Sequence, residues 1–417
     1  MVHVLSLLAL ASVFALATAL PVNMGLLAFV AAFLLAALSG LPADDVLGAF
    51  PGDTFVLVVG ITLLFGVAKV NGTIDLVVAA SLRLVRGKRW AVTWLMFALS
   101  AVLMSLGSVL AAGMLAPIAM PIAARYRIKP LLMALMLLHG MASTAFSPIT
   151  VYGAFTTRVV GEAGFAVDPL LLFAVPFGLN VLIATLLWAL LGRRPSEVDQ
   201  GTGGPGTVAA PPVAAVPDVR VTPMRAVTLT GMVALLVAGV LGVDVGIAAL
   251  VIGTALLLAS PFGHASSFDH VSWNAVVLVC GMLTCMAVLE RNGTLDLLGD
   301  AAAALGSPAL AALLLCLAVG VVSAFGSSIG TLGIGLPLAF PLLEQGQLGA
   351  AGVVVALAFC STVVDISPFS TNGVIVLAQA QVADKRRFQR RMLAYCGLVV
   401  VGAPLLAWST AVLPGSL

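Results

Sequence analysis

The chain has 417 residues, of which 61% are hydrophobic and 9% are charged, and its formal net charge is +2. Because soluble domains carry roughly 25% charged residues, this composition excludes an ordinary soluble protein. The net charge says little, since the placement of charge matters more than its sum. Apolar stretches long enough to cross a bilayer recur along the chain. We therefore expect an all-α, multi-pass membrane protein.

The first half predicts five membrane helices, at about 2–20, 23–40, 54–70, 130–160 (broken) and 169–191. No positive region precedes the first apolar run, so we expect a retained helix rather than a signal peptide. Residues 90–123 form two short arms around Gly107 and Ser108, a pattern that favours a re-entrant hairpin. Residues 74–84 are too short to span and are interpreted as an interfacial arm.

The second half predicts the same order, with helices at about 226–242, 245–260, 273–290, 350–383 (broken) and 392–412. A second hairpin is expected at 308–343, around Ser327 and Ser328, and a second interfacial arm at 295–305. Five crossings in each half, an odd number, would invert the second half relative to the first. The predicted fold is thus two inverted repeats, each with about five transmembrane helices, one re-entrant hairpin and one broken helix.

The breaks recur in register, as expected of secondary transporters with internal repeats. Asn71-Gly72-Thr73 matches Asn292-Gly293-Thr294 at a spacing of 221 residues. At a spacing of 220, the first half's Ser108, Gly113, Pro117, Pro121, Ser147-Pro148 and Gly153 match Ser328, Gly333, Pro337, Pro341, Ser367-Pro368 and Gly373. We interpret each Asn-Gly-Thr as a helix end, in which Gly closes one helix and Thr caps the next.

Charge placement orients the drawing. Most of the 19 basic residues fall in loops predicted to be cytoplasmic, whereas the predicted outer loops are acidic. Both termini then face outward. Residues 1–191 form the first repeat and 225–417 the second, and 192–224, rich in Gly, Pro and Ala, is predicted to be a flexible cytoplasmic linker.

The broken helices carry the candidate site. Pro148 and Pro368 each remove a donor and clash with the preceding turn, which is expected to free the carbonyls near Thr144 and Val364. Helices that begin at the breaks and tips point positive N-terminal dipoles at one place. The predicted anion-binding residues are Gly107, Ser108, Ser147, Thr150, Ser327, Ser328, Ser367, Ser370, Thr371 and Asn372. The alternative is a simple proline kink with local serine bonding.

Asp365 is the only carboxylate well inside a predicted span. We interpret it as a coupling-ion residue, with Thr144 and Val364 beside it; whether the ion is a proton or sodium stays open. A structural carboxylate is the alternative. His139 is more typical of packing than of proton transfer, and Arg158 of snorkelling than of anion entry. The five cysteines lack metal-ligand spacing, and no metal, cofactor or catalytic residue is predicted.

Several stretches resemble the bacterial malonate/dicarboxylate carrier family, namely LPVNMGLLAF (20–29), VNGTIDLVVAASLRLVRG (70–87), LAPIAM (115–120) and HGMASTAFSPITVYGAFT (139–156). SPFSTNG (367–373) resembles the wider divalent-anion transporter superfamily. The resemblance implies a homodimer with a scaffold and an elevator-like transport part, and carboxylate binding at hairpin tips with a Ser-Asn-Thr motif. At those places this chain has Gly107-Ser108-Val109 and Ser327-Ser328-Ile329.

The sequence therefore predicts a non-enzymatic, cation-coupled carrier of small organic anions, such as malonate or succinate, in the bacterial inner membrane. The expected partners are the substrate anion, the lipid bilayer and a second copy of the chain, with no nucleic acid. An exporter or exchanger of another anion is one alternative. A polytopic membrane enzyme is another; the lack of clustered His, Cys or carboxylate residues counts against it.

Overall fold

The computed structural model describes residues 2–20, 22–84, 88–105, 107–109, 111–192, 220–241, 243–295, 297, 306–382 and 384–413. All regular elements in these ranges are helical, which confirms the predicted fold class. The linker predicted at 192–224 lies mostly outside the described residues, as does the interfacial arm predicted at 295–305.

The helices of the first half follow the predicted order. They are α1 (Val2–Ala19), α2 (Met24–Ser39), α3 (Ala43–Gly48), α4 (Gly52–Val70), α5 (Thr73–Leu84), α6 (Arg89–Ser105), α7 (Ala111–Arg125), α8 (Pro130–Ser143), α9 (Val151–Glu162) and α10 (Pro169–Leu191). Short α3 was not predicted, since six residues give no readable periodicity.

The second half contains α11 (Pro223–Val240), α12 (Val245–Ala259), η1 (Ala265–His270), α13 (Trp273–Arg291), α15 (Pro308–Phe325), α16 (Ser328–Glu344), α17 (Ala350–Val363), η2 (Val364–Ile366), α18 (Thr371–Gln379), α19 (Lys385–Ala407) and η3 (Trp408–Val412). Among the described residues, six helical segments are long and apolar enough to cross a membrane: 52–70, 169–191, 273–291, 308–325, 350–379 and 385–412. The other predicted spans are shorter apolar helices. Because α15 is itself long enough to span, re-entry of the hairpins stays a prediction.

Two close helix crossings join the halves. A Cβ atom built on Gly281 of α13 would lie 2.0 Å from the carbonyl oxygen of Gly25 in α2. A Cβ atom on Gly60 of α4 would lie 2.6 Å from the carbonyl oxygen of Gly246 in α12. Only glycine allows backbones to approach this closely inside a membrane protein. Helices α2 and α4 thus pack mainly against second-half helices.

The two Asn-Gly-Thr segments also make matching contacts. The Asn71 side chain donates to Thr228 of α11 at 2.7 Å, and that of Asn292 donates to Ser6 of α1 at 3.0 Å. Gly72 and Gly293 take positive φ angles of 74° and 73°. Thr73 donates its backbone N–H to the Asn71 side chain. The prediction that Thr caps the next helix is therefore wrong, because the asparagine oxygen, two residues earlier, is the acceptor.

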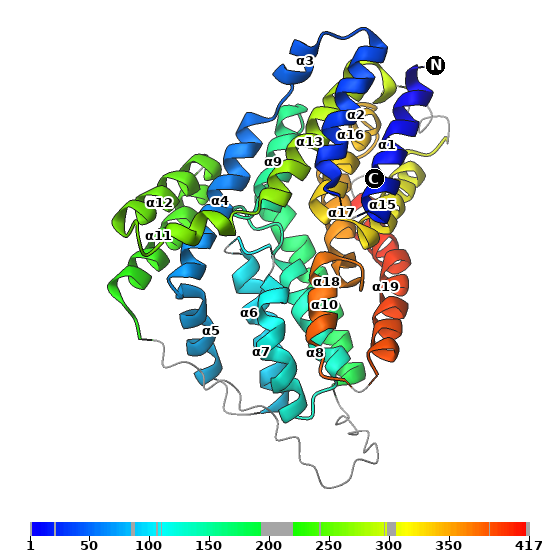
Figure 1. The fold of residues 1–417 in the computed structure, drawn as a ribbon. Coiled ribbons are helices and arrows are strands. Elements are labelled where there is room, and N and C mark those ends of the chain that lie inside the picture. The colour runs from blue at the N-terminus through cyan, green and yellow to red at the C-terminus, as the bar shows by residue number, and fades with distance from the viewer. Residues whose placement is uncertain are drawn as a thin grey trace.

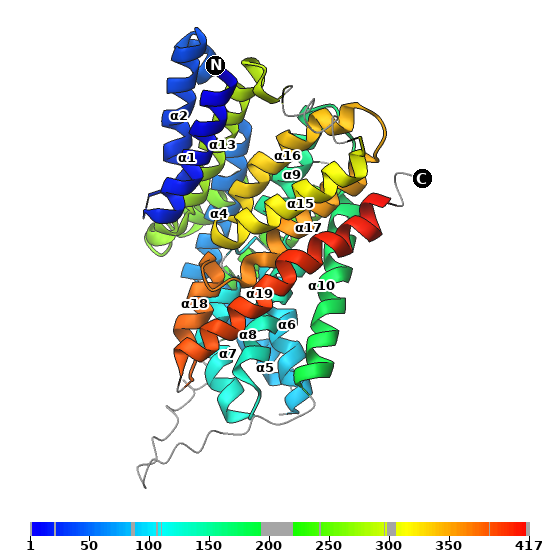
Figure 2. The ribbon, with the colours of Figure 1, turned by 90° about the vertical axis from the view of Figure 1, so that its right-hand side faces the viewer.

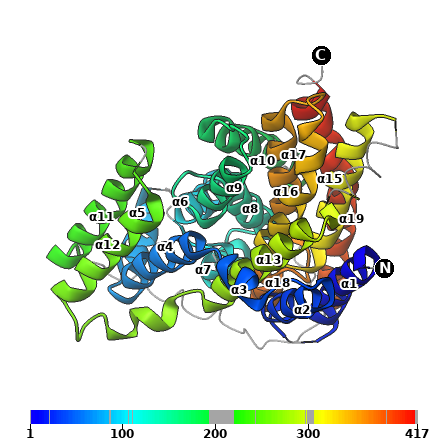
Figure 3. The same ribbon diagram turned by 90° about the horizontal axis from the view of Figure 1, so that it is seen from above.

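Figures 1 and 2 show hairpin α6–α7 in the lower half of the molecule and hairpin α15–α16 in the upper half. Both chain ends lie in the upper half, whereas the end of α7 and the start of α19, which precede or carry basic runs, lie in the lower half. Seen from above, α11, α12 and α5 flank α4 on one side, and α1 and α2 lie at the far side next to α13 (Figure 3). The broken helices lie between these flanks.

Candidate functional site

The first break lies between α8 and α9. Thr150 accepts a hydrogen bond from the N–H of Gly153 at 3.0 Å and donates its own proton to the carbonyls of Ala145 and Ser147. A Cβ atom on Gly153 would lie 2.2 Å from the Ser147 carbonyl oxygen, so this turn requires glycine. Thr144 donates to the carbonyl of Ala101 in α6 at 2.6 Å and ties the break to the first hairpin.

The second break repeats this cap. Ser370 accepts from the N–H of Gly373 at 3.1 Å and donates to the carbonyls of Asp365 and Ser367. A Cβ atom on Gly373 would lie 1.9 Å from the Ser367 carbonyl oxygen. Ser367 itself accepts from the N–H of Phe369 at 3.2 Å. The spacing of 220 residues between the two caps in sequence thus corresponds to the same local geometry.

The caps change the interpretation of the freed carbonyls. The Thr144 carbonyl accepts from Ser147 N–H at 3.1 Å, and the Val364 carbonyl accepts from Ser367 N–H at 2.9 Å. The expectation that the prolines leave these carbonyls unpaired is therefore wrong, because the chain turns at each break and supplies a new donor. Each carbonyl keeps a second lone pair for a ligand.

Asp365 is 7% exposed and lies where the second break meets the second hairpin tip. Its side-chain oxygen accepts a 2.6 Å hydrogen bond from Ser328, the first residue of α16. Ser323 lies 3.1 Å from Ser328 and donates to the carbonyl of Ser361 in α17 at 2.6 Å. One carboxylate thereby joins the hairpin to the broken helix.

The first hairpin tip is held by the second broken helix. Asn372 of α18 donates its amide N–H to the carbonyl of Val109 at 3.2 Å, next to Ser108. This bond fixes the orientation of the amide, and its buried Oδ1 has no hydrogen-bond partner among the described residues. Gly107 has a φ of 107°, which favours glycine. An orphaned buried acceptor is costly, so Asn372 is suited to a donor brought by a ligand or by water.

Each broken helix packs its second part against the other half's hairpin. Helix α9 packs on α16, and α18 packs on α7. Tyr152 in the first turn of α9 and Asn372 in the first turn of α18 occupy equivalent positions, 220 residues apart. Tyr152 interacts with Ser328 and with the charge of Asp365. Sequence reasoning missed Tyr152, and its signal was this equivalence with Asn372.

The predicted residues divide by what their side chains do. Ser328, Ser367, Asn372, Ser108 and Ser147 are buried at the tips and breaks. Thr150 and Ser370 are also buried, but their protons are committed to backbone carbonyls as helix caps. Ser327 is half-buried before α16, and Thr371 is exposed. The geometry thus brings Ser328, Asp365 and Ser367 to one tip and Asn372 and Ser108 to the other.

His139, in the middle of the membrane region, is fully buried and fully bonded. Its Nδ1 lies 2.8 Å from the side-chain oxygen of Asn180 in α10, and its Nε2 lies 2.7 Å from the hydroxyl of Tyr395 in α19. Because the Asn180 amide N–H donates to the Pro176 carbonyl, Nδ1 carries the proton and Nε2 accepts from Tyr395. A neutral histidine with a packing role fits these contacts.

Arg158 forms ion pairs with two carboxylates of neighbouring helices. It lies 3.4 Å from Asp53 of α4 and also contacts Asp244, which caps α12. The snorkelling expected for Arg158 is therefore not observed, because Asp53 and Asp244 converge where α9 ends. The five cysteines are buried, as predicted. Among the described residues, no group of three or more His, Cys, Asp or Glu side chains is arranged to hold a metal ion.

A cavity of about 820 Å³ opens between α4, α9, α13 and α16 on the predicted outer side. The charged side chains among its lining residues are all acidic: Asp53, Glu162, Glu290 and Glu344. Such a mouth has a negative potential that attracts cations and repels anions.

Comparisons with known proteins agree with this architecture. Residues 1–145 match the family model of the dicarboxylate carrier protein MatC N-terminus, and residues 233–415 match the citrate transporter family model. A comparison with curated proteins gave no match. The fold is similar to the crystal structure of the Alcanivorax borkumensis YdaH transporter, described as having an unusual topology, at 16% identity and a TM-score of 0.60 over 87% of this chain and 86% of that one.

Both family models and the structural neighbour are transporters, in agreement with the expectation of a non-enzymatic role. Together with the apolar helices, they confirm a multi-pass membrane protein. The two family matches also confirm the resemblance seen in the sequence. The chain belongs to the malonate/dicarboxylate carriers of the ion transporter superfamily, with a dicarboxylate-carrier N-terminal region and a citrate-transporter C-terminal region.

Proposed function

We propose that this protein is a secondary active transporter that moves small dicarboxylates, such as malonate or succinate, across the bacterial inner membrane in symport with a cation. The observation that carries the proposal is the 2.6 Å bond between Ser328 and Asp365, which joins a hairpin tip to a helix break. The printed names of the two matched families, a dicarboxylate carrier and a citrate transporter, support this substrate class.

The anion would bind between the two tips. Helices α9, α16 and α18 begin there, and their N-terminal N–H groups and dipoles favour negative charge. Ser327 leaves the start of α16 without a side-chain cap, so its first N–H groups are open to a carboxylate. Asn372 supplies a buried acceptor for a hydroxyl or a water that accompanies the substrate.

Coupling follows from the charge of Asp365. An ionised carboxylate inside the site repels a dianion, and at low dielectric this repulsion is strong. A proton or sodium ion bound at Asp365 removes that repulsion, so the anion and the cation would bind together. Thr144 and Val364 remain in the proposal as carbonyl ligands through their second lone pairs. No further cofactor is proposed.

An elevator-like movement fits the packing. The helix pairs α2–α13 and α4–α12, each with a close glycine crossing, are proposed as the scaffold. The hairpins and broken helices are proposed as the moving part, because the tips are bonded to the breaks rather than to the scaffold helices. We propose a homodimer in which the scaffolds of two copies meet.

The experiment is uptake of labelled malonate and succinate into proteoliposomes of the purified protein under separately imposed sodium and proton gradients. We expect accumulation with one gradient and simple equilibration without any. Absence of gradient-driven accumulation of either acid, by protein shown to be folded, would overturn the proposal.

A second candidate is export or exchange of an organic anion. It is favoured by the acidic cavity on the predicted outer side, lined by Asp53, Glu162, Glu290 and Glu344. This mouth lowers the local concentration of an outside dianion and speeds the departure of one released there. Exchange of preloaded succinate without gradient-driven uptake would favour this candidate.

A further inference from the structure

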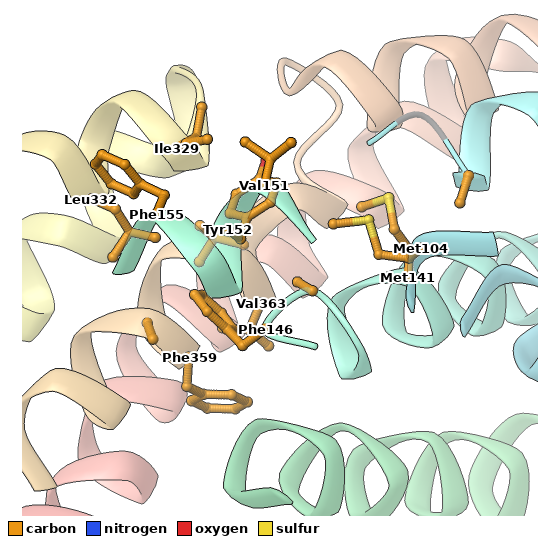
Figure 4. Close-up of a cluster of buried hydrophobic side chains, with 14 of the residues drawn as sticks. Met104, Met141, Phe146, Val151, Tyr152, Phe155, Ile329, Leu332, Phe359 and Val363 are labelled. Carbon is orange, nitrogen blue, oxygen red and sulfur yellow. The ribbon is translucent and has the colours of Figure 1, made fainter. Parts of the chain in front are cut away.

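One buried polar side chain next to Asp365 has no part in the proposed function. Tyr152 is 5% exposed and lies in the first turn of α9, in the half of the chain that does not contain Asp365. Its ring packs edge-on against Phe146, with centroids 6.1 Å apart. Figure 4 shows Tyr152 and Phe155 in the same cluster as Ile329 of α16 and Val363 of α17. The ring is therefore fixed between the break and the second hairpin.

The hydroxyl end of Tyr152 meets the carboxylate group of the site. It interacts with the hydroxyl of Ser328 and with the charge of Asp365. The equivalent side chain, Asn372, bonds to the carbonyl of Val109 at the other tip. Both broken helices therefore use the same position to hold the opposite hairpin tip, and only at the second tip does this position meet a carboxylate.

Proton counting sets the direction of these bonds. Ser328 has one proton, which goes to Asp365 at 2.6 Å, and Ser323 gives its proton to the carbonyl of Ser361. Tyr152 is then the donor toward the Ser328 oxygen. When Asp365 carries a proton, the chain reverses: Asp365 donates to Ser328, and Ser328 donates to Tyr152. Two hydroxyls in series can therefore bond the carboxyl group in either state.

We propose that Tyr152 is a positioning residue for Asp365, which acts through Ser328 and ties cation binding at the carboxylate to docking of the second hairpin on α9. This inference rests on the proposed cation-coupled transport. The other titratable group that interacts with Asp365 among the described residues is Cys396 of α19. On α8, His139 is bonded to Asn180 and Tyr395, and Cys316 and Cys360, on α15 and α17, contact each other.

The test is Tyr152→Phe, which keeps the ring and removes the hydroxyl. Succinate accumulation in proteoliposomes is measured against pH, and against sodium concentration if sodium drives the wild type. Loss of one donor to the chain that stabilises the carboxylate should raise the pH of half-maximal uptake by about 0.4 to 1 unit, or raise the half-saturating sodium concentration about three- to tenfold. Tyr126→Phe, at the end of α7 and away from the site, is the matched control and should leave both values unchanged.

An unchanged midpoint in a folded, accumulating Tyr152→Phe protein overturns the inference. A wild type that accumulates nothing under any gradient instead refutes the proposed function. A second measurement does not depend on the variant. Infrared difference spectra of wild-type protein across the midpoint should show a tyrosine C–O band that changes together with the protonated-carboxyl band, and a carboxyl change without a tyrosine change overturns the inference too.

Discussion

Ser328 and Ser108 are equivalent in sequence but differ in what they bond, which gives a matched pair of substitutions. Ser328 donates to the buried carboxylate of Asp365 at 2.6 Å, whereas Ser108 approaches only the sulfur of Met114, at 3.4 Å. A hydrogen bond to a charged group is worth about 1.5–3 kcal/mol, while a thioether is a weak acceptor. Ser328→Ala should therefore release the second tip from the break, and Ser108→Ala should change little.

The expected magnitude follows from population. If a dicarboxylate binds only when the tip is docked, the lost 1.5–3 kcal/mol weakens apparent binding by up to about 10- to 150-fold. For Ser108→Ala, a loss of about 0.5 kcal/mol or less gives roughly a twofold change. Binding of labelled succinate to purified protein in nanodiscs measures both. Melting temperatures close to that of the wild type establish that each variant is folded.

The comparison also has a refuting result. Equal affinities for Ser328→Ala and Ser108→Ala, with both proteins folded, would show that the bond to Asp365 does not control the tip. A larger loss for Ser108→Ala would place the substrate at the first tip alone.

Other predictions use different parts of the chain. Asp365→Asn should keep substrate exchange but lose gradient-driven accumulation, and full accumulation by this variant would rule out the coupling role. Gly281→Ala should lower the melting temperature in detergent, since its Cβ would lie 2.0 Å from a backbone oxygen and overpacking costs about 1–3 kcal/mol or more; Gly402→Ala, with open space around it, is the control. Arg158→Gln should lower the melting temperature by about 1–3 °C at low ionic strength, with the difference fading in high salt. A cysteine introduced in the 192–224 linker should resist an impermeant reagent in intact cells while cysteines at the termini react, and the opposite pattern would contradict the predicted topology.

Sequence patterns predicted the helices because each relies on local information. Proline, the capping hydroxyls and the glycine of each break act within a few residues, so the breaks before Val151 and Thr371 were visible in the chain. Hydropathy predicted the long helices for the same reason. The six-residue elements α3 and η1 carry too few residues to show a period.

The missed features depend on partners that are distant in sequence. Nothing near Tyr152 indicates that its ring packs beside a hairpin in the other half, and an aromatic residue at a break looks like ordinary core. The ion pairs of Arg158 with Asp53 and Asp244 join three separate helices. The cap and carbonyl bonds around Thr144 and Val364 depend on the turn that follows each helix, which the presence of proline alone does not specify.

The glycine crossings also constrain how the chain matures. Helix α2 packs on α13 and α4 packs on α12, so two early helices have partners that the ribosome makes more than two hundred residues later. During synthesis, the surfaces around Gly25 and Gly60 must stay exposed to lipid until those partners insert. The first half therefore cannot reach its final packing by itself, and assembly of the protein is completed only after most of the chain has entered the membrane.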